Sequence, residues 1–195
     1  LSVGVPMISG GDELSLSHLG NNNSYCHDSD LNWYNWELST AEIEFLEFLK
    51  SLTAFRAQQP VFQRRRFLTG QTNSATGLKD LIWFDANGAE ISGDDWHRAP
   101  IQSFGMCLVG SEMGEVDERG VTIEGKSVAV LVNTQEEASF FLLPTLPGHE
   151  RWEIVMNTAR RPSFLLEQEP YPKTGQVLEA KSSVIVVQWD SSRRK

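Results

Sequence analysis

The chain has 195 residues, of which 40% are hydrophobic and 22% are charged, a composition typical of a globular protein with a sizeable core. Its formal net charge of −9 argues against nucleic-acid binding, because lysine and arginine supply the affinity for phosphates. No apolar run approaches the roughly 18 residues that span a bilayer, and no basic signal-peptide region opens the chain. Cys26 and Cys107 lie far apart, which suits a reducing compartment, although one disulfide stays open. We therefore expect a soluble, cytoplasmic protein.

The first predicted element is the apolar run Leu1–Ser9, which is typical of a strand buried on both faces of a parallel sheet. Such a strand needs a neighbour on each side, so we expect the chain to begin in the middle of a domain. The following segment, Gly10–Cys26, reads GGDELSLSHLGNNNSYC and has no helical or strand period. It is predicted to be a polar loop.

A helix is predicted next, in the sequence STAEIEFLEFLKSLTAFRAQ. Ser39 and Glu42 form a capping box at its start. Apolar residues recur with helical spacing at Ile43, Phe45, Leu46, Leu49, Leu52 and Phe55. Strand, loop and helix form one βα unit of a parallel α/β architecture, whose loops at the carboxyl ends of strands carry binding sites. The polar loop is thus expected on a functional rim.

From Pro60 onward, short β-rich runs alternate with turns, a pattern that predicts an antiparallel β-sandwich or barrel. Asn87-Gly88 suits a tight hairpin turn. We predict an α/β part at residues 1–57 and an all-β part at residues 58–195, with a long connection between Arg64 and Asp80. The RRR run in that connection is more typical of a solvated or domain-bridging cluster than of an anion site.

One stretch matches the letters of a nucleotide-binding motif, but the secondary structure predicted around it does not fit that motif. Gly120–Ser127, GVTIEGKS, satisfies the phosphate-loop pattern. A phosphate loop must open a helix, whereas β-branched residues follow here. A hairpin turn around Gly125 is the preferred interpretation.

No metal site is expected. Asp28, Asp30 and Asn32 alternate as in a calcium loop, but Trp33 stands where glycine is needed and Ser39 where glutamate is needed. The four histidines form no i, i+4 pair.

Sugar binding has two candidate groups of residues. The aromatic residues Trp33, Tyr34 and Trp36 suit stacking on sugar rings and, equally, packing against a neighbouring strand. Glycoside hydrolysis needs two carboxyl groups roughly 5 to 9 Å apart. Asp12 and Glu13 are adjacent, so their side chains are expected to diverge, and each fits either a sugar hydroxyl or a loop hydrogen bond.

Four stretches of the chain resemble, in order and spacing, the C-terminal part of bacterial glycogen-debranching enzymes of the isoamylase type, in the α-amylase superfamily. They are GVPMISGGDE, GNNNSYCHDSDLNWYNWE, FRAQQPVFQRRRFLTG and DLIWFDANGAEISGDDW, and a looser likeness continues to Gln188. The resemblance implies a catalytic (β/α)8 barrel followed by a C-terminal β-sandwich domain. Val3–Ser9 would be the eighth barrel strand and Ser39–Phe55 the eighth helix.

The same resemblance implies a retaining glycoside hydrolase that cleaves α-1,6 branch linkages in glycogen or related α-glucans, with no cofactor. The family's nucleophile, acid/base and second aspartate lie on barrel strands four, five and seven. All of them would precede Leu1. We therefore expect no catalytic residue in this chain, which would be inactive without the missing N-terminal barrel of the same polypeptide.

What the resemblance leaves here is the loop after strand eight. It implies substrate-binding roles for Asp12, Glu13, Asn21, Asn22, Asn23 and Tyr25. His27 stands where the family more often has glutamine, which leaves the substrate preference open. Two other function classes also stay open: a free-standing, non-catalytic α-glucan-binding module that uses the aromatic residues from Trp33 to Trp36, and a β-sandwich that docks a partner.

Overall fold

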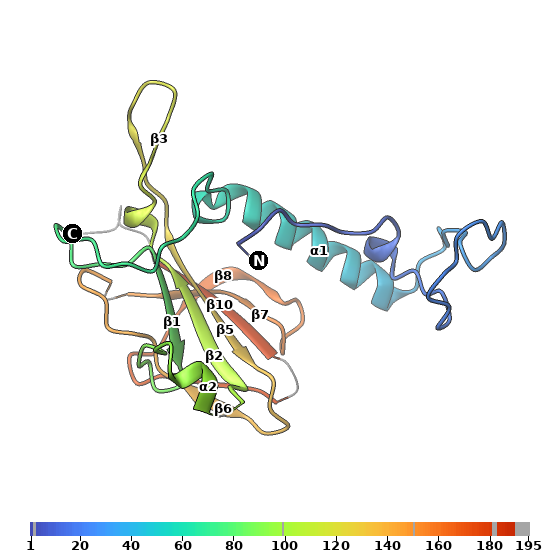
Figure 1. The fold of residues 1–195 in the computed structure, drawn as a ribbon. Helices are drawn as coiled ribbons and strands as arrows, with labels where there is room; N and C mark the ends of the chain where they lie inside the picture. The colour runs from blue at the N-terminus through green and yellow to red at the C-terminus, as the bar shows by residue number, and fades with distance from the viewer. Residues whose placement is uncertain (2, 99, 150, 181–182, 190–195) are drawn as a thin grey trace. The chain divides into compact units, whose positions relative to one another are not determined.

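The computed structural model describes residues 1, 3–98, 100–149, 151–180 and 183–189 (Figure 1). The chain divides into two compact units, Leu1–Gln58 and Gln59–Lys195, which are called the N-terminal unit and the sandwich unit below. Whether residues 1–57 end a catalytic barrel, and whether residues 58–195 form a complete domain, stays a prediction.

The N-terminal unit contains a 3-10 helix, η1 (Asp12–Leu14), and a long helix, α1 (Thr40–Gln58). The predicted helix and its capping box are confirmed. Glu42 Oε2 accepts hydrogen bonds from both Ser39 N and Ser39 Oγ at 2.7 Å, and Glu42 N donates to Ser39 Oγ. The bond from the Ser39 backbone N–H, followed by that from its hydroxyl, lowers the pKa of Glu42. The carboxylate therefore stays charged at the positive end of the helix dipole.

The predicted strand Val3–Ser9 is not formed in this chain, because the described residues of the N-terminal unit include no β-strand. The side chains of Val5 and Met7 are 98% and 91% exposed. A parallel strand is stabilised by a hydrogen-bonded neighbour and by side chains packed on both faces. Among the residues described in this unit neither is present, so the apolar run forms no ladder.

The sandwich unit is built on a six-stranded sheet in which every neighbouring pair is antiparallel. Its spatial order is β1 (Leu81–Asp85), β2 (Ser103–Leu108), β5 (Ser127–Asn133), β10 (Ser183–Trp189), β7 (Glu153–Asn157) and β8 (Phe164–Pro170). Two small two-stranded sheets pair β3 (Glu115–Val116) with β4 (Thr122–Ile123), and β6 (Ser139–Phe141) with β9 (Gln176–Leu178). The helices described in this unit are short: η2 (Pro60–Phe62), η3 (Gly110–Glu112) and α2 (Asp95–Arg98). The prediction of antiparallel β-structure after Pro60 is confirmed.

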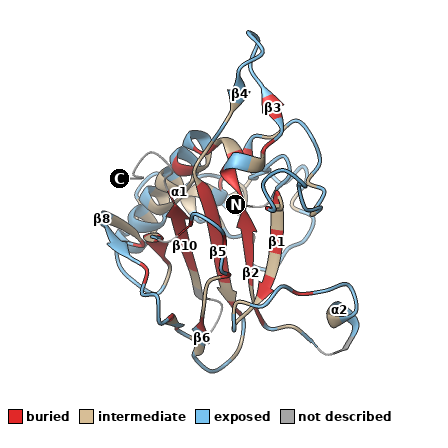
Figure 2. Cartoon of the chain, turned by 90° about the vertical axis from the view of Figure 1, so that its left-hand side faces the viewer, coloured by how far each residue is buried: buried red, intermediate tan, exposed pale blue. Residues whose placement is uncertain are grey.

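The core of this unit lies between one face of the large sheet and the β6–β9 layer. Phe84 and Leu131 from the large sheet meet Phe141 and Leu178, and all four side chains are fully buried. The packing is close enough that a Cβ added to Gly105 would lie 2.1 Å from Phe84 Cζ. Figure 2 shows the central strands β2, β5 and β10 in red, the colour of buried residues.

The connection after η2 is held by two buried carboxylates. Asp80 accepts hydrogen bonds from Thr69 N at 3.0 Å and Gly70 N at 2.8 Å, and it forms an ion pair with Arg64 at 3.1 Å. Glu115 accepts from the backbone N–H groups of Arg65 and the following arginine. Arg64 is thus a structural partner of Asp80, while the side chains of the next two arginines are exposed.

The pKa values of both carboxyl groups reflect these contacts. Burial acts to raise the pKa of Asp80, but the Thr69 and Gly70 N–H groups and the Arg64 guanidinium outweigh it and hold the pKa below its ordinary value. For Glu115, burial is likewise outweighed by the two arginine N–H groups and the nearby positive charges. Both side chains are therefore charged acceptors at neutral pH.

The predicted hairpin turn at Asn87-Gly88 is confirmed. Gly88 adopts a φ of 78° and donates its N–H to Asp85 O, while Asp85 N donates to Ala89 O at 2.9 Å. The turn expected around Gly125 lies elsewhere: Gly120, with a φ of 78°, turns the β3–β4 hairpin. Gly125 instead contacts Gly110 so closely that a Cβ on Gly110 would lie 2.0 Å from Gly125 O.

Candidate functional site

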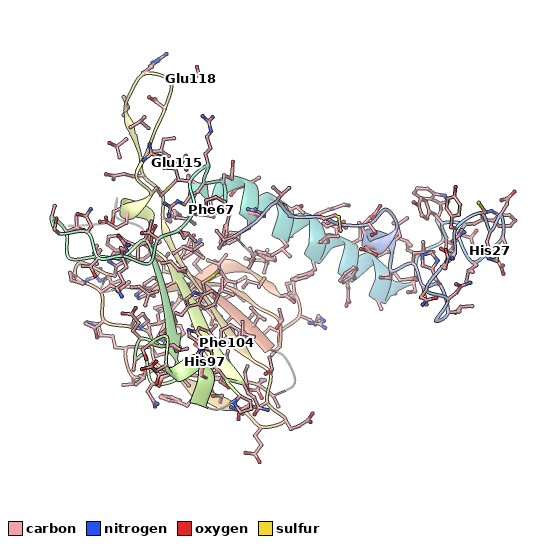
Figure 3. All side chains as sticks on the ribbon, viewed as in Figure 1. His27, Phe67, His97, Phe104, Glu115 and Glu118 are labelled. Carbon is pink, nitrogen blue, oxygen red and sulfur yellow. The ribbon has the colours of Figure 1, made fainter. Side chains whose placement is uncertain are left out.

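The candidate site is the segment Gly10–Trp36, which extends the predicted polar loop Gly10–Cys26 toward α1. The name polar loop refers to this longer segment below. Hydrogen bonds between residues far apart in sequence give it a fixed shape. His18 Nδ1 lies 3.1 Å from Leu31 O, so Nδ1 carries the proton. Asn32 Nδ2 donates to Ser24 O and His27 O, both at 2.7 Å. Figure 3 labels His27 within this loop.

Asp12 and Glu13 begin η1, and both carboxylates bind the backbone beside them. Asp12 Oδ2 accepts from Ser9 N at 3.1 Å, and Glu13 Oε2 accepts from Gly11 N at 2.9 Å. These bonds match the loop-structuring alternative of the sequence analysis. Within the described residues, the second oxygen of each carboxylate accepts no hydrogen bond, so each side chain keeps one acceptor for another group.

Asn21, Asn22, Asn23 and Tyr25 all lie exposed near the middle of the loop. Asn21 Oδ1 accepts from Asn23 N at 2.8 Å, a turn in which the asparagine side chain replaces a backbone carbonyl. No hydrogen bond joins this group to Asp12 or the adjacent glutamate among the residues that the structure describes. The six predicted substrate-binding residues thus form two groups.

Tyr34 links the two ends of the polar loop. Cβ atoms added to Gly10 and Gly11 would lie 3.0 Å from Tyr34 Oη and 2.9 Å from Tyr34 Cε1. The two glycines are therefore needed for the tyrosine ring to lie against the backbone, a contact that sequence analysis missed. Trp36 meets the Tyr34 ring edge to face, with centroids 6.1 Å apart. Of the three aromatic residues considered for sugar stacking, Tyr34 packs within the loop.

The other two aromatic residues present exposed rings. Trp33 and Trp36 are 61% and 77% exposed. Trp33 Nε1 donates to Asp28 Oδ1 at 2.9 Å, which fixes its indole while leaving the ring open to solvent. Asp28 therefore accepts a hydrogen bond from an indole through one of its carboxylate oxygens. The described residues contain no group of three or more histidine, cysteine, aspartate or glutamate side chains arranged to hold a metal.

Backbone strain is concentrated in this loop. Ser15, Leu19 and Cys26 have φ values of 60°, 51° and 64°, and within the described chain they are the non-glycine residues in the left-handed region. This conformation costs an L-residue roughly 1–3 kcal/mol and tends to occur at functional sites. The strain supports a functional interpretation of the loop.

The two cysteines are free and lie in different surroundings. Cys26 is exposed in the polar loop, whereas Cys107 is buried in the core of the sandwich unit. Burial raises the pKa of Cys107 to about 12. Its thiol is therefore protonated and unreactive at neutral pH.

Among the residues that the structure describes, no helix combines the length and the hydropathy needed to cross a bilayer.

Comparison with curated proteins finds relatives over most of the chain. A glycogen operon protein GlgX homologue from Mycobacterium tuberculosis is 31% identical over 159 residues, which is 81% of this chain and 22% of the relative. An isoamylase from Flavobacterium sp. is 31% identical over 159 residues, covering 82% of this chain and 19% of the relative. No protein-family model matches the chain. The chain thus spans about a fifth of the length of the curated relatives it matches.

Solved structures share the fold. A pullulanase from Bacillus acidopullulyticus superposes on 95% of this chain and 18% of its own, with a TM-score of 0.59 and 18% identity. A pullulanase from Anoxybacillus sp. LM18-11, complexed with maltotetraose, gives a TM-score of 0.55 over 96% of this chain at 16% identity. At such identities the likeness establishes the fold alone.

Proposed function

We propose, from the premise that this chain is homologous to one segment of the GlgX and isoamylase proteins, that it is the C-terminal part of a glycogen-debranching glycoside hydrolase. The whole enzyme would cleave α-1,6 branch linkages in glycogen or related α-glucans. The catalytic carboxylates would lie in a preceding barrel of the same polypeptide, and this chain alone would be inactive. One observation carries the proposal. The alignment with the GlgX homologue, at 31% identity, covers 81% of this chain but 22% of the relative.

In this proposal the N-terminal unit completes the catalytic barrel. Val3–Ser9 becomes the eighth strand once neighbouring strands flank it, and α1 becomes the eighth helix. The exposure of Val5 and Met7 supports this assignment, because a barrel would bury both side chains. Ile43 and Phe45 on α1 are also exposed, at 49% and 41%, although they belong to its apolar pattern.

The polar loop then borders the sugar-binding cleft without performing the covalent chemistry. The free oxygens of Asp12 and Glu13 suit sugar hydroxyl donors, and the amides of Asn21, Asn22 and Asn23 both donate and accept. Tyr25 offers an exposed ring for the apolar face of a pyranose. These contacts would hold the branch in place for the upstream nucleophile and acid/base, so their loss should lower kcat/KM.

The same proposal places the enzyme in the cytoplasm. A glycogen-type substrate suits that compartment, and free Cys26 and Cys107 suit a reducing one. No cofactor is needed for hydrolysis by two carboxyl groups.

The test uses the polypeptide from its native source that contains this sequence, alongside the 195-residue chain. We expect the native polypeptide to release linear chains from glycogen and the short chain to release none, as measured by debranched product and new reducing ends. Tyr25→Ala in the native polypeptide should lower kcat/KM by about tenfold or more. Phe140→Ala, which removes an exposed ring from β6, is the matched control and should change it little. The proposal would be contradicted if the 195-residue chain debranched glycogen, or if the native polypeptide showed no debranching activity.

A free-standing α-glucan-binding module is the second candidate, favoured by the exposed rings of Trp33 and Trp36. It predicts that the chain binds maltoheptaose tightly and that Trp36→Ala abolishes this binding. The debranching proposal predicts at most weak binding at the polar loop without the rest of the cleft.

A further inference from the structure

The sandwich unit carries an aromatic cluster that the proposed active-site role does not use. Trp83 on β1, Trp96 on α2 and Phe104 on β2 form it and are called the α2 cluster below. The Trp83 ring centroid lies 5.8 Å from that of Trp96, edge to face, and 6.0 Å from that of Phe104. Figure 3 labels Phe104 of this cluster and His97, which follows Trp96 in the sequence.

The α2 cluster lies on the face of the large sheet that points away from the core. On β1, Ile82 and Phe84 enter the core, so Trp83 between them points to the opposite face. Trp83 and Phe104 are half-buried, and Trp96 is 43% exposed. An aromatic surface therefore faces solvent on the sandwich unit.

The segment that carries Trp96 is anchored to the sheet. Ile91 is buried and donates its N–H to Trp83 O at 2.8 Å. Ser92 donates both its N–H and its hydroxyl to Asp95 Oδ2, which ties the turn before α2 to the first residue of that helix. The ring of Trp96 is thus held in place before any ligand arrives, which lowers the entropic cost of binding.

Polar groups accompany the rings. Among the described residues, the indole N–H groups of Trp83 and Trp96 donate to no acceptor, and the Trp83 nitrogen is not sealed from solvent. Asp94 and His97 flank Trp96 and are exposed. A surface that combines an aromatic face with free donors and acceptors at its edge matches a sugar, which has an apolar C–H face and a rim of hydroxyl groups.

We propose that the α2 cluster is a second α-glucan-binding surface, which takes a linear α-1,4-linked chain by stacking a pyranose ring on Trp96. The exposed carboxylate of Asp94 and the net charge of −9 disfavour anionic ligands and leave a neutral polyol as the suitable class. The identity of the glucan rests on the proposed function, whose substrate is a polymer with many chain ends. A second contact with the same polymer raises the local concentration of its chains at the enzyme.

The experiment is a calorimetric titration of the 195-residue chain with maltoheptaose, together with electrophoresis in gels with and without glycogen. Trp96→Ala should raise the Kd for maltoheptaose by about tenfold and remove the retardation by glycogen. The matched control is Phe67→Ala, which removes a ring that is 96% exposed on the same unit and should leave both readouts unchanged. Thermal unfolding of both variants checks that the sandwich unit remains folded.

The proposal would be overturned by no binding by the unaltered chain, by unchanged binding by folded Trp96→Ala, or by equal losses with Phe67→Ala. Loss of binding in Trp36→Ala alone would place the glucan at the polar loop and would also overturn it. Self-association that Trp96→Ala abolishes, without glucan binding, would identify the α2 cluster as a protein interface instead.

The test of the α2 cluster can fail or succeed independently of the test of the proposed function. Debranching by the native polypeptide tests the function through the polar loop and the upstream carboxylates. Binding of glucan that depends on Trp96 supports the α2 cluster even if the native polypeptide fails to debranch.

Discussion

The two units of the chain differ in how far they bury their apolar side chains. In the sandwich unit, Leu131 and Phe141 are fully buried between the large sheet and the β6–β9 layer. In the N-terminal unit, Val5 and Met7 lie almost wholly in solvent. Both units have sequences patterned for burial, but only the sandwich unit contains the elements that cover its own pattern. The difference supports the proposal that the N-terminal unit completes a larger domain.

The largest expected effect concerns carboxylates that bind backbone N–H groups in each unit. Asp80→Asn should cost about 3–5 kcal/mol of unfolding free energy, because Arg64 would remain buried without its charged partner. Asp12→Asn, which alters an exposed carboxylate, should cost less than about 0.5 kcal/mol. Urea unfolding followed by circular dichroism measures both values, and similar costs would remove the distinction between the units.

Two side-chain truncations, one in each unit, test the difference in burial of apolar residues. Leu131→Ala should cost about 2–5 kcal/mol, because it leaves a cavity in a closed core. Met7→Ala should change stability by less than about 0.5 kcal/mol in the 195-residue chain. In the native polypeptide, the proposed barrel would bury Met7, and the same change should then cost about 2 kcal/mol or more. An equally small cost in the native polypeptide would contradict the strand assignment.

Acid should weaken the sandwich unit through Asp80 and Glu115. The pKa of each is lowered in the folded protein, so the unfolded state binds protons more readily. The stabilisation is complete above the unfolded carboxyl pKa of about 4 and is lost as the pH falls through the lower folded values. Unfolding free energies between pH 7 and pH 2 should show this loss, and Asp80→Asn should reduce its slope. If Asp80→Asn left this slope unchanged, Asp80 would not contribute to the acid sensitivity of the sandwich unit.

Sequence patterns predicted the parts of the fold that depend on local chemistry. The capping box of Ser39 and Glu42 and the turn at Gly88 involve residues close in sequence, and both are confirmed. The strand Val3–Ser9 is not formed in this chain, because strand formation depends on partners, which a local apolar pattern does not reveal. The buried pair of Arg64 and Asp80 was missed for a related reason, since a run of arginines gives no sign that one of them meets a carboxylate 16 residues away.

The candidate site was predictable in its location and less so in its arrangement. The density of polar residues between Gly10 and Cys26 marked the loop. Its internal bonds, such as those from Asn32, join residues whose pairing follows no periodic rule. The packing of Tyr34 on two glycines had one available signal, the adjacent glycines themselves, which mark a close approach of a neighbouring group.

The smallest effect involves thiol chemistry and no change of stability. Cys26 is exposed, whereas burial raises the pKa of Cys107 to about 12. Iodoacetamide at pH 8 should therefore label Cys26 rapidly and Cys107 only after unfolding, as peptide mass spectrometry can measure. Equal labelling rates in the folded chain would show that the core of the sandwich unit opens readily.

The central claim is that the N-terminal unit belongs to a larger catalytic domain in the same polypeptide. The most direct test is the intact mass of the native protein, captured from its source with an antibody raised against the sandwich unit. The account predicts a mass several times the 21.9 kDa of this chain, with the strand-loop-helix sequence preceded by further polypeptide. A native mass near 21.9 kDa would contradict it and favour the free-standing glucan-binding module.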